Sequence, residues 1–143
     1  MGKKKVAEQK GTAEITATAP KSGGKKSHKV LDGRVYINAS YNNTVVSVTD
    51  KSGNLLAWAT AGSLGFSGPK KATPFASSKV IAAISEKVKP MGLSTIDIIV
   101  KGVGGGRDSA IRSLINQGFA VSSVKDVTPI PHNGPRPKKI RRV

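Results

Sequence analysis

The sequence contains no cysteine, only two histidines, and few aromatic residues, which make up 4% of its 143 positions. Without cysteine, neither a disulfide framework nor a thiolate metal site can form. His28 and His132 are too few and too far apart in the chain to predict a zinc or iron site. The longest unbroken apolar run covers residues 80–84, far short of the roughly 18 residues of a membrane-spanning helix. We therefore expect no metal, no cofactor and no membrane contact.

Acidic residues are also scarce. The chain has 8 Asp and Glu against 24 Lys and Arg, which gives a formal net charge of +16. A compact domain with such a charge repels itself, and a polyanion partner neutralises that repulsion. Since 143 residues leave room for one core, the composition predicts a single, strongly basic domain with a polyanion as its partner.

Most of this charge lies at the two ends of the chain. Residues 1–29 hold eight lysines and two glutamates, and residues 132–143 hold five basic residues and no acid. Neither segment has the apolar content that folding requires, so we expect both to order only along a phosphate backbone. The sequence thus divides into a basic extension (1–30), an α/β domain (31–131) and a basic tail (132–143).

Hydrophobic periodicity predicts the elements of the domain. Three short alternating or β-branched runs, separated by turn residues, predict an antiparallel meander over residues 34–40, 44–49 and 55–60. The Gly-, Ser- and Pro-rich residues 61–71 favour no regular structure. Thr73 and Pro74 then predict the N-cap and first residue of a helix that runs to about residue 89.

The second half of the domain alternates strand and helix. Residues 96–101 are a continuous β-branched run, typical of a strand in a sheet covered by helices. A helix follows over residues 108–117, with Ile111, Leu114 and Ile115 as its apolar face and Gly118 at its end. Residues 119–128 predict the last strand. The order β-β-β-α-β-α-β indicates an α/β fold with a mixed five-stranded sheet.

A glycine-rich stretch, KGVGGGRDS, links the fourth strand to the second helix. It lacks the G-x-G-x-x-G spacing, because Arg107 occupies the third glycine position, and it lacks the Gly-Lys-Ser/Thr ending of a P-loop. Glycines permit close backbone approach and a helix N-terminus favours anions, so Lys101, Arg107 and these glycines predict a contact with a nucleic-acid phosphate. The alternative interpretation is a tight connection that packs helix on sheet.

Enzymatic alternatives depend on acidic residues. The domain has six acidic residues, and none of them forms a paired spacing such as D-x-D. They are Asp32, Asp50, Glu86, Asp97, Asp108 and Asp126. A metal-dependent nuclease would need several of them to converge, and a Ser-His-Asp site has no glycine-flanked serine to use. We expect no enzyme, while a nuclease and a nonspecific nucleoid binder stay open as alternatives.

Polar loops favour RNA held by shape and backbone over sequence reading of DNA. Asn42, Asn43 and the loop 65–71 offer short polar side chains and bare amides. Most of the aromatic residues are expected to pack in the core or strands, and only Tyr41 and Phe66 lie in predicted loops where they can stack on bases.

Three long motifs resemble the family of bacterial small-subunit ribosomal protein eleven. They are SYNNTVVSVTDKSGNLLAWATAGSLGFSGPKKATPFA, KGVGGGRDSAIRSL and DVTPIPHNGPRPKKIRRV, and the resemblance covers residues 33–143. It implies a ribonuclease H-like topology without the active site, and a cytoplasmic, ribosomal location with no homo-oligomer. It also implies a place on the platform of the small subunit, where the protein bridges ribosomal RNA helices and helps form the Shine–Dalgarno cleft for messenger RNA. Ribosomal proteins seven and eighteen are the implied neighbours, and initiation factor three an implied partner.

Resemblance and charge together predict the RNA-binding residues. By position, the family's RNA-facing parts correspond to residues 42–43, 67–71, 104–107 and the tail from His132, and charge adds the basic clusters. The full set is Lys25, Lys26, Lys29, Asn42, Asn43, Ser67, Gly68, Lys70, Lys71, Lys101, Gly104, Gly106, Arg107, His132, Asn133, Arg136, Lys138, Lys139, Arg141 and Arg142.

The chain departs from the family pattern in three places. Val103 and Gly105 replace two customary prolines, Gly-Pro-Arg-Pro-Lys replaces a stretch that usually holds a cysteine, and residues 1–30 have no counterpart. Asn133 precedes Gly134, where little steric protection makes isoaspartate formation an expectation. The resemblance supports it, because some members carry isoaspartate there.

Overall fold

Three strands joined by tight turns begin the fold, in a computed structural model that describes residues 31–140. They are β1 (Asp32–Ala39), β2 (Thr44–Asp50) and β3 (Leu55–Thr60), each antiparallel to the next. Along β1, Val35, Ile37 and Ala39 are buried while the residues between them face outward. The predicted meander is confirmed.

The chain between β3 and the first helix is more regular than predicted. It contains two short 3-10 turns, η1 (Gly62–Leu64) and η2 (Gly68–Ala72). Gly65 ends the first turn with a φ of 87°, which favours glycine, and Pro69 lies in the first turn of η2. The expectation of no regular structure over residues 61–71 was therefore wrong, because the same Gly and Pro residues that prevent a long helix suit single turns.

Helix α1 (Pro74–Val88) begins and ends where its capping residues predict. The Thr73 hydroxyl accepts a hydrogen bond from the Ala76 N–H at 3.3 Å, and Pro74 is the first helical residue. A 3-10 turn, η3 (Lys89–Met91), follows and ends at Gly92, whose φ is 86°. Val80, Ile81, Ile84 and Val88 are buried against the sheet, as their spacing indicates.

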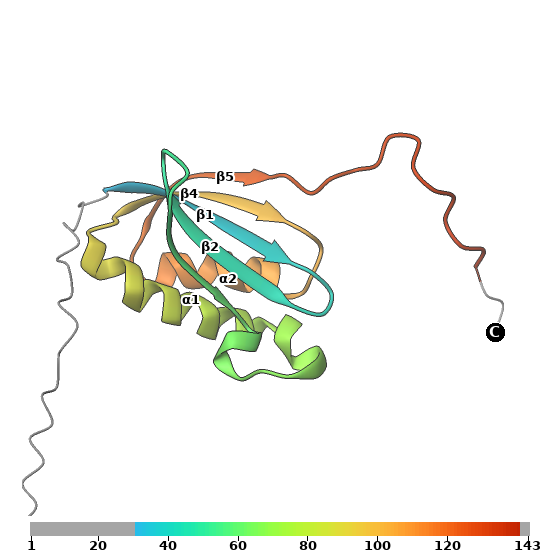
Figure 1. The fold of residues 1–143 in the computed structure, drawn as a ribbon, viewed down its shortest axis with the longest axis horizontal. Coiled ribbons are helices and arrows are strands. Elements are labelled where there is room, and N and C mark those ends of the chain that lie inside the picture. Colours follow the sequence, from blue (N-terminus) through green and yellow to red (C-terminus); the bar gives the residue numbers. More distant parts are fainter. Residues whose placement is uncertain (1–30, 141–143) are drawn as a thin grey trace, which may run out of the picture.

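The remaining elements complete a single α/β domain. Strand β4 (Thr95–Lys101) pairs in parallel with β1, helix α2 (Gly106–Asn116) follows, and β5 (Ala120–Asp126) pairs in parallel with β4. The sheet order is β3-β2-β1-β4-β5 (Figure 1). The predicted order of elements and the mixed five-stranded sheet are confirmed.

Both α-helices cover the same face of the sheet, and the opposite face is left open (Figure 1). Burial along β4 alternates for this reason, so the predicted strand covered by helices is buried on one side only. Three aromatic side chains assigned to packing by the sequence lie exposed, and two of them are on strands: Trp58 is 55% and Tyr36 38% accessible. Phe75, at the start of α1, is 64% accessible.

Small residues bring α1 and α2 together. The buried residues of α2 are Gly106, Ala110 and Leu114, whereas Ile115, expected on the apolar face, is exposed. Hydroxyl groups line the contact, since Ser77 bonds Ser109 and the Ser113 hydroxyl donates to that of Ser78 at 3.0 Å. The predicted apolar face is therefore confirmed for Leu114, which is buried, and for Ile111, which packs against the core, and wrong for Ile115.

The loop between β4 and α2 passes very close to the end of β1. The Gly104 N–H donates to the Ala39 carbonyl at 2.9 Å, and a Cβ on Gly104 would overlap the Ser40 carbonyl oxygen. Gly102 has a φ of 99°, and a Cβ there would overlap the Ala39 carbonyl. The glycines of this loop are thus required by the chain's own packing.

Gly104→Ala should destabilise the domain, because the added Cβ meets backbone atoms that cannot move without distorting β1. Overpacking of this kind costs about 1–3 kcal/mol. The neighbouring Gly105→Ala is the matched control, since its Cβ would have only Ala72 O nearby, at 3.7 Å. Thermal unfolding of the two variants measures the difference, and equal melting temperatures would contradict the close-contact interpretation.

Candidate nucleic-acid interface

The predicted binding segments of the domain meet at one edge of the sheet. Strands β1, β3, β4 and β5 run in the same direction, so their carboxyl ends lie together, and both α-helices begin there (Figure 1). We define the loop edge as the segments that follow these strands, residues 40–43, 61–73, 102–105 and 127–128. Segments far apart in sequence thus form one surface.

Hydrogen bonds and close contacts tie the segments of the loop edge to one another. Residue 104 bonds the end of β1, Ala61 N–H donates to the Thr44 carbonyl at 3.1 Å, and the Ser109 hydroxyl donates to the Pro74 carbonyl at 3.2 Å. The loop edge is therefore a packed surface and not a set of independent loops.

The turn between β1 and β2 presents Asn42 with its backbone fixed. The Asn43 N–H donates to the Ser40 hydroxyl at 3.0 Å, and that hydroxyl donates to the Asn43 carbonyl at 3.0 Å. Asn42 and Tyr41 are exposed, while Asn43 is half-buried. Of the two asparagines, Asn42 is thus the better placed to meet a ligand.

The segment from Ser67 to Lys71 lies on the outside of the loop edge. Ser67, Gly68 and Lys70 are exposed and Lys71 is half-buried. An aromatic contact holds this segment on α1, because the rings of Phe66 and Phe75 meet edge to face with centroids 6.0 Å apart. Its cations are therefore presented from an ordered backbone.

The glycine stretch places Lys101 and Arg107 differently. Lys101, the last residue of β4, is exposed, whereas Arg107 is half-buried at the start of α2. Gly104 and Gly106 are themselves buried, and a Cβ on Gly106 would lie 2.5 Å from the Thr44 hydroxyl. These two predicted site glycines therefore shape the loop, and Lys101 and Gly105 face outward.

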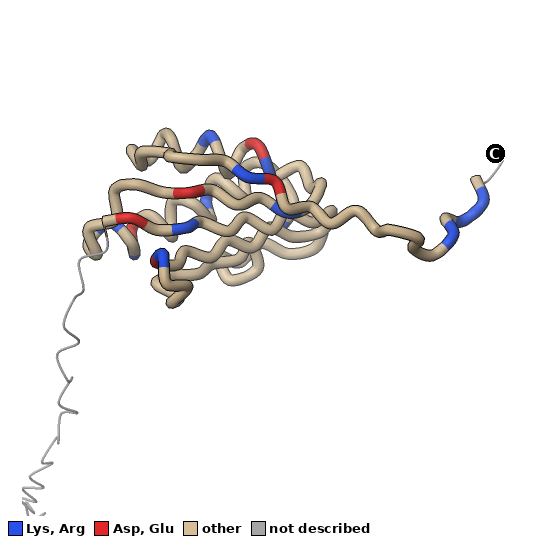
Figure 2. Tube along the Cα trace, turned by 90° about the horizontal axis from the view of Figure 1, so that it is seen from above, with Lys and Arg blue, Asp and Glu red and all other residues tan. Residues whose placement is uncertain are grey.

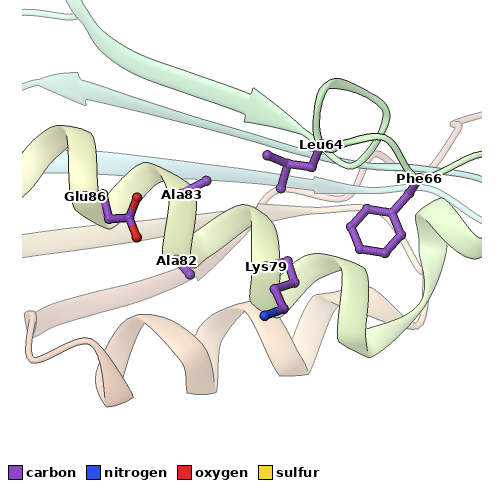
Figure 3. Close-up of a pocket in the computed structure, with 6 residues that line it drawn as sticks. All are labelled: Leu64, Phe66, Lys79, Ala82, Ala83 and Glu86. Carbon is purple, nitrogen blue, oxygen red and sulfur yellow. The ribbon is translucent and has the colours of Figure 1, made fainter.

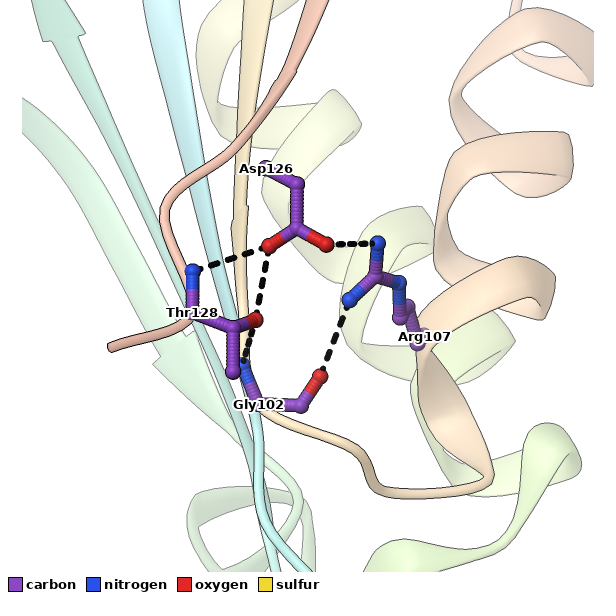
Figure 4. A network of polar contacts seen from close by, with 4 residues as sticks. All are labelled: Gly102, Arg107, Asp126 and Thr128. Carbon is purple, nitrogen blue, oxygen red and sulfur yellow. Dashed lines mark hydrogen bonds and ion pairs between the residues drawn. The ribbon is translucent and has the colours of Figure 1, made fainter. Parts of the chain in front are cut away.

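A closed ring of polar contacts joins the glycine loop to the end of β5 (Figure 4). Arg107 Nη2 lies 2.7 Å from Asp126 Oδ2, and Arg107 Nη1 donates to the Gly102 carbonyl at 3.1 Å. Asp126 Oδ1 accepts from the Thr128 N–H at 2.8 Å and from its hydroxyl at 2.6 Å. The Gly102 N–H donates to the Thr128 hydroxyl at 3.1 Å and completes the ring. Nothing in the local sequence predicts it, since Arg107 and Asp126 are 19 residues apart.

The ring lowers the pKa of Asp126 well below its ordinary value of 3.8. The Thr128 hydroxyl contributes most, followed by the Arg107 guanidinium and the Thr128 N–H, because all three stabilise the carboxylate. The same effect acts at the opposite edge. Lys51, 2.8 Å from Asp32, lowers the pKa of that carboxyl group, and Asn54 lowers the pKa of Asp50.

The C-terminal tail leaves the domain from the loop edge (Figure 1). The last backbone hydrogen bond to the sheet is donated by the Val127 N–H to the Val100 carbonyl at 2.9 Å. Residues 129–140, which follow, are exposed. Figure 2 shows basic residues and no acidic ones along this described part of the tail, where Arg136, Lys138 and Lys139 lie. His132 and Asn133 are also exposed, and Asn133 has a φ of 53°. The predicted residues Lys25, Lys26, Lys29, Arg141 and Arg142 lie outside the described part of the chain.

An open apolar groove of about 380 Å³ lies beside α1 (Figure 3). Leu64, Phe66 and two alanines line it, with Lys79 and Glu86 as its charged groups. None of these residues belongs to the predicted RNA-binding set, and the single carboxylate of the groove provides no acid–base pair.

The acidic and histidine side chains of residues 31–140 lie apart from one another. No three Asp, Glu or His side chains of that span lie close enough together to hold a metal ion. None of the helices described there is both long and apolar enough to cross a membrane. The six acids of the domain thus do not converge as a metal-dependent nuclease requires.

Comparisons with known proteins agree with the family that the three sequence motifs resemble. The family described as Ribosomal protein S11 matches residues 33–142. The "Small ribosomal subunit protein uS11" of Treponema pallidum (strain Nichols) is 51% identical over 119 residues, 83% of this chain and 94% of its own length. The protein of the same name from Cellvibrio japonicus (strain Ueda107) is 52% identical over 126 residues, 88% of this chain and 95% of its own length.

Acid should destabilise the domain through these carboxylates. A carboxyl group whose pKa is lowered in the folded state contributes stability above its unfolded pKa, and this contribution is lost as the pH falls through the folded pKa. The free energy of unfolding should therefore decline as the pH drops below about 3.8. Denaturant titrations of wild type and Asp126→Asn measure it: the two curves should converge toward low pH, and a gap that stays constant would exclude the Asp126 contribution.

Proposed function

The chain belongs to the ribosomal protein S11 family, and from this membership we propose that it is a structural, non-enzymatic component of the small ribosomal subunit that binds ribosomal RNA through the loop edge and its basic tails. The observation that supports this most is the convergence of four polar or basic segments, with the exit of the C-terminal tail, at one edge of the sheet.

The chemistry of the loop edge suits a phosphate backbone. Lys70, Lys71 and Lys101 supply positive charge, and Asn42 and Gly68 supply short donors without steric bulk. The N-termini of α1 and α2 add the positive ends of two helix dipoles. Apart from the short turns η1 and η2, no helix of the described residues lies across this edge to read bases, so the proposed binding recognises the shape and backbone of folded RNA.

The positions of the two tails support a bridging role. The C-terminal tail leaves from the loop edge, whereas residue 31 joins β1 at the opposite edge, roughly 25 Å away for a strand of this length. The basic extension 1–30 and the tail 132–143 are thus tethered on opposite sides of the domain. This arrangement allows separate RNA helices to be engaged at once.

Family membership carries the finer proposals. The protein is placed in the cytoplasm, on the platform of the small ribosomal subunit, where it helps form the Shine–Dalgarno cleft for messenger RNA. It contacts ribosomal proteins seven and eighteen there, and initiation factor three is a further partner. The sheet order β3-β2-β1-β4-β5, with β1 at the centre, supports the ribonuclease H-like topology that the resemblance implies.

Asn133 is proposed as a site of isoaspartate formation. It is exposed, and it precedes Gly134, which leaves its side-chain amide open to attack by the next backbone nitrogen. Ageing of the purified protein should produce isoaspartate at Asn133 and much less at the exposed Asn42, which precedes no glycine. Peptide mass spectrometry with isoaspartate-specific methylation measures both sites, and equal modification would contradict the steric argument.

Deleting residues 132–143 should weaken RNA binding more than Lys101→Ala. Each lost phosphate contact lowers the slope of log K against log salt by about 1, so the single variant should lose about 1 and the deletion several times that. Binding to small-subunit ribosomal RNA at a series of salt concentrations measures the slopes. Equal slopes for the two variants would contradict the proposed role of the tail.

Duplex DNA is the control for specificity. Nonspecific phosphate binding fades steeply with salt, so at about 150 mM salt the wild-type chain should prefer ribosomal RNA. Equal affinity for the two polymers there would favour a nonspecific nucleic-acid binder instead.

A further inference from the structure

We propose that Arg107, Asp126 and Thr128 are positioning residues for RNA binding, which fix the direction in which the C-terminal tail leaves the loop edge. The proposal rests on the proposed function. It adds a group of residues that orient the C-terminal tail without contacting the RNA themselves. It also gives Arg107 a different task from the direct phosphate contact that its sequence context predicts.

Two of the guanidinium donors of Arg107 are used within the protein. One guanidinium nitrogen donates to the Gly102 carbonyl at 3.1 Å and another lies 2.7 Å from Asp126, while the side chain is only 29% accessible. A guanidinium bound in this way to a carboxylate and a carbonyl has a fixed orientation. A phosphate would have to displace the carboxylate to take the same donors.

Asp126 connects this fixed guanidinium to the first residues of the tail. Its other oxygen accepts both the N–H and the hydroxyl of Thr128, and the Thr128 hydroxyl in turn accepts from the Gly102 N–H. The backbone at 126–128 is therefore held on two sides, by β4 through Val127 and by α2 through Arg107 (Figure 4). Beyond Thr128 the described tail has no helix or strand, so its direction is set here.

A fixed exit raises the local concentration of the tail at the RNA. Pro129 and Pro131 restrict the backbone that follows, so an orientation set at Thr128 persists for several residues. A tail that starts in the correct direction loses less conformational freedom on binding than one that can swing away. The ring thereby promotes contacts made by residues several positions further on.

Removing the charge of Asp126 distinguishes a positioning role of Arg107 from direct phosphate binding by Arg107, because the two roles predict opposite effects. If Arg107 contacts phosphate, removing Asp126 frees the guanidinium and removes a repulsive carboxylate, so the affinity should rise. If the ring positions the tail, Asp126→Ala should weaken binding although the net charge becomes more positive. The expected loss is about three- to tenfold in Kd, the size of a coupling between residues in one network.

Two further variants complete the test. Thr128→Val removes the hydroxyl but keeps the volume and both charges, and it should weaken binding as Asp126→Ala does. Asp108→Ala is the matched control: it removes another exposed carboxylate, on α2 and outside the ring, and it should leave the affinity unchanged or raise it. Melting temperatures confirm that each variant folds.

The decisive measurement is the Kd of the full chain for small-subunit ribosomal RNA at about 150 mM salt, with and without residues 132–143. The proposal expects both Asp126→Ala and Thr128→Val to weaken binding in the full chain. In the shortened chain Thr128→Val should have no effect, and Asp126→Ala should leave binding unchanged or make it tighter, because it removes a carboxylate that repels RNA. Unchanged or tighter binding by both variants in the full chain would overturn it, as would an equal loss in the shortened chain. Wild-type protein that does not bind this RNA would instead refute the proposed function itself.

Discussion

The contact between residues 102–104 and the end of β1 is the constraint on which the rest of the structure depends. Gly104 bonds the Ala39 carbonyl, and neither Gly102 nor Gly104 can carry a Cβ without overlapping that backbone. This approach lets the chain pass from β4 into α2 within four residues. Helix α2 therefore begins at the loop edge, and Arg107 comes within reach of the end of β5.

The distribution of charge over the domain depends on this geometry as well as on composition. The N-termini of α1 and α2 lie at the loop edge with Lys70, Lys71 and Lys101, so helix dipoles and side chains act in the same direction. At the opposite edge Asp32 pairs with Lys51, and Asp50 is bound by Asn54 within its turn. The net charge of +16 therefore does not show that, among the described residues, Lys70, Lys71 and Lys101 lie at the loop edge while the acids of the opposite edge have partners.

The sequence predicted the elements well because their signals are local. Thr73 and Pro74 locate the start of α1, and alternation along β1 identifies its buried face. The exposure of individual side chains could not be predicted in the same way. Trp58 is apolar but lies on the open face of the sheet. Ile115 is apolar but points away from the contact between α1 and α2. The Arg107–Asp126 contact was also missed, because it depends on the pairing of β4 with β5 and on the path of the glycine loop.

Asp126 is the residue whose position is hardest to explain by RNA binding alone. A carboxylate at an edge that meets a polyanion repels it, and its pairing with Arg107 also neutralises a cation of the same edge. Both effects oppose binding locally. The chain beyond Thr128 leads to the tail 132–143 with its five basic residues, so in the proposed function a fixed exit acts on more phosphate contacts than the ring removes. In the proposed mode of binding, the edge therefore offers one cation fewer to the RNA, and the tail gains a defined path for its own cations.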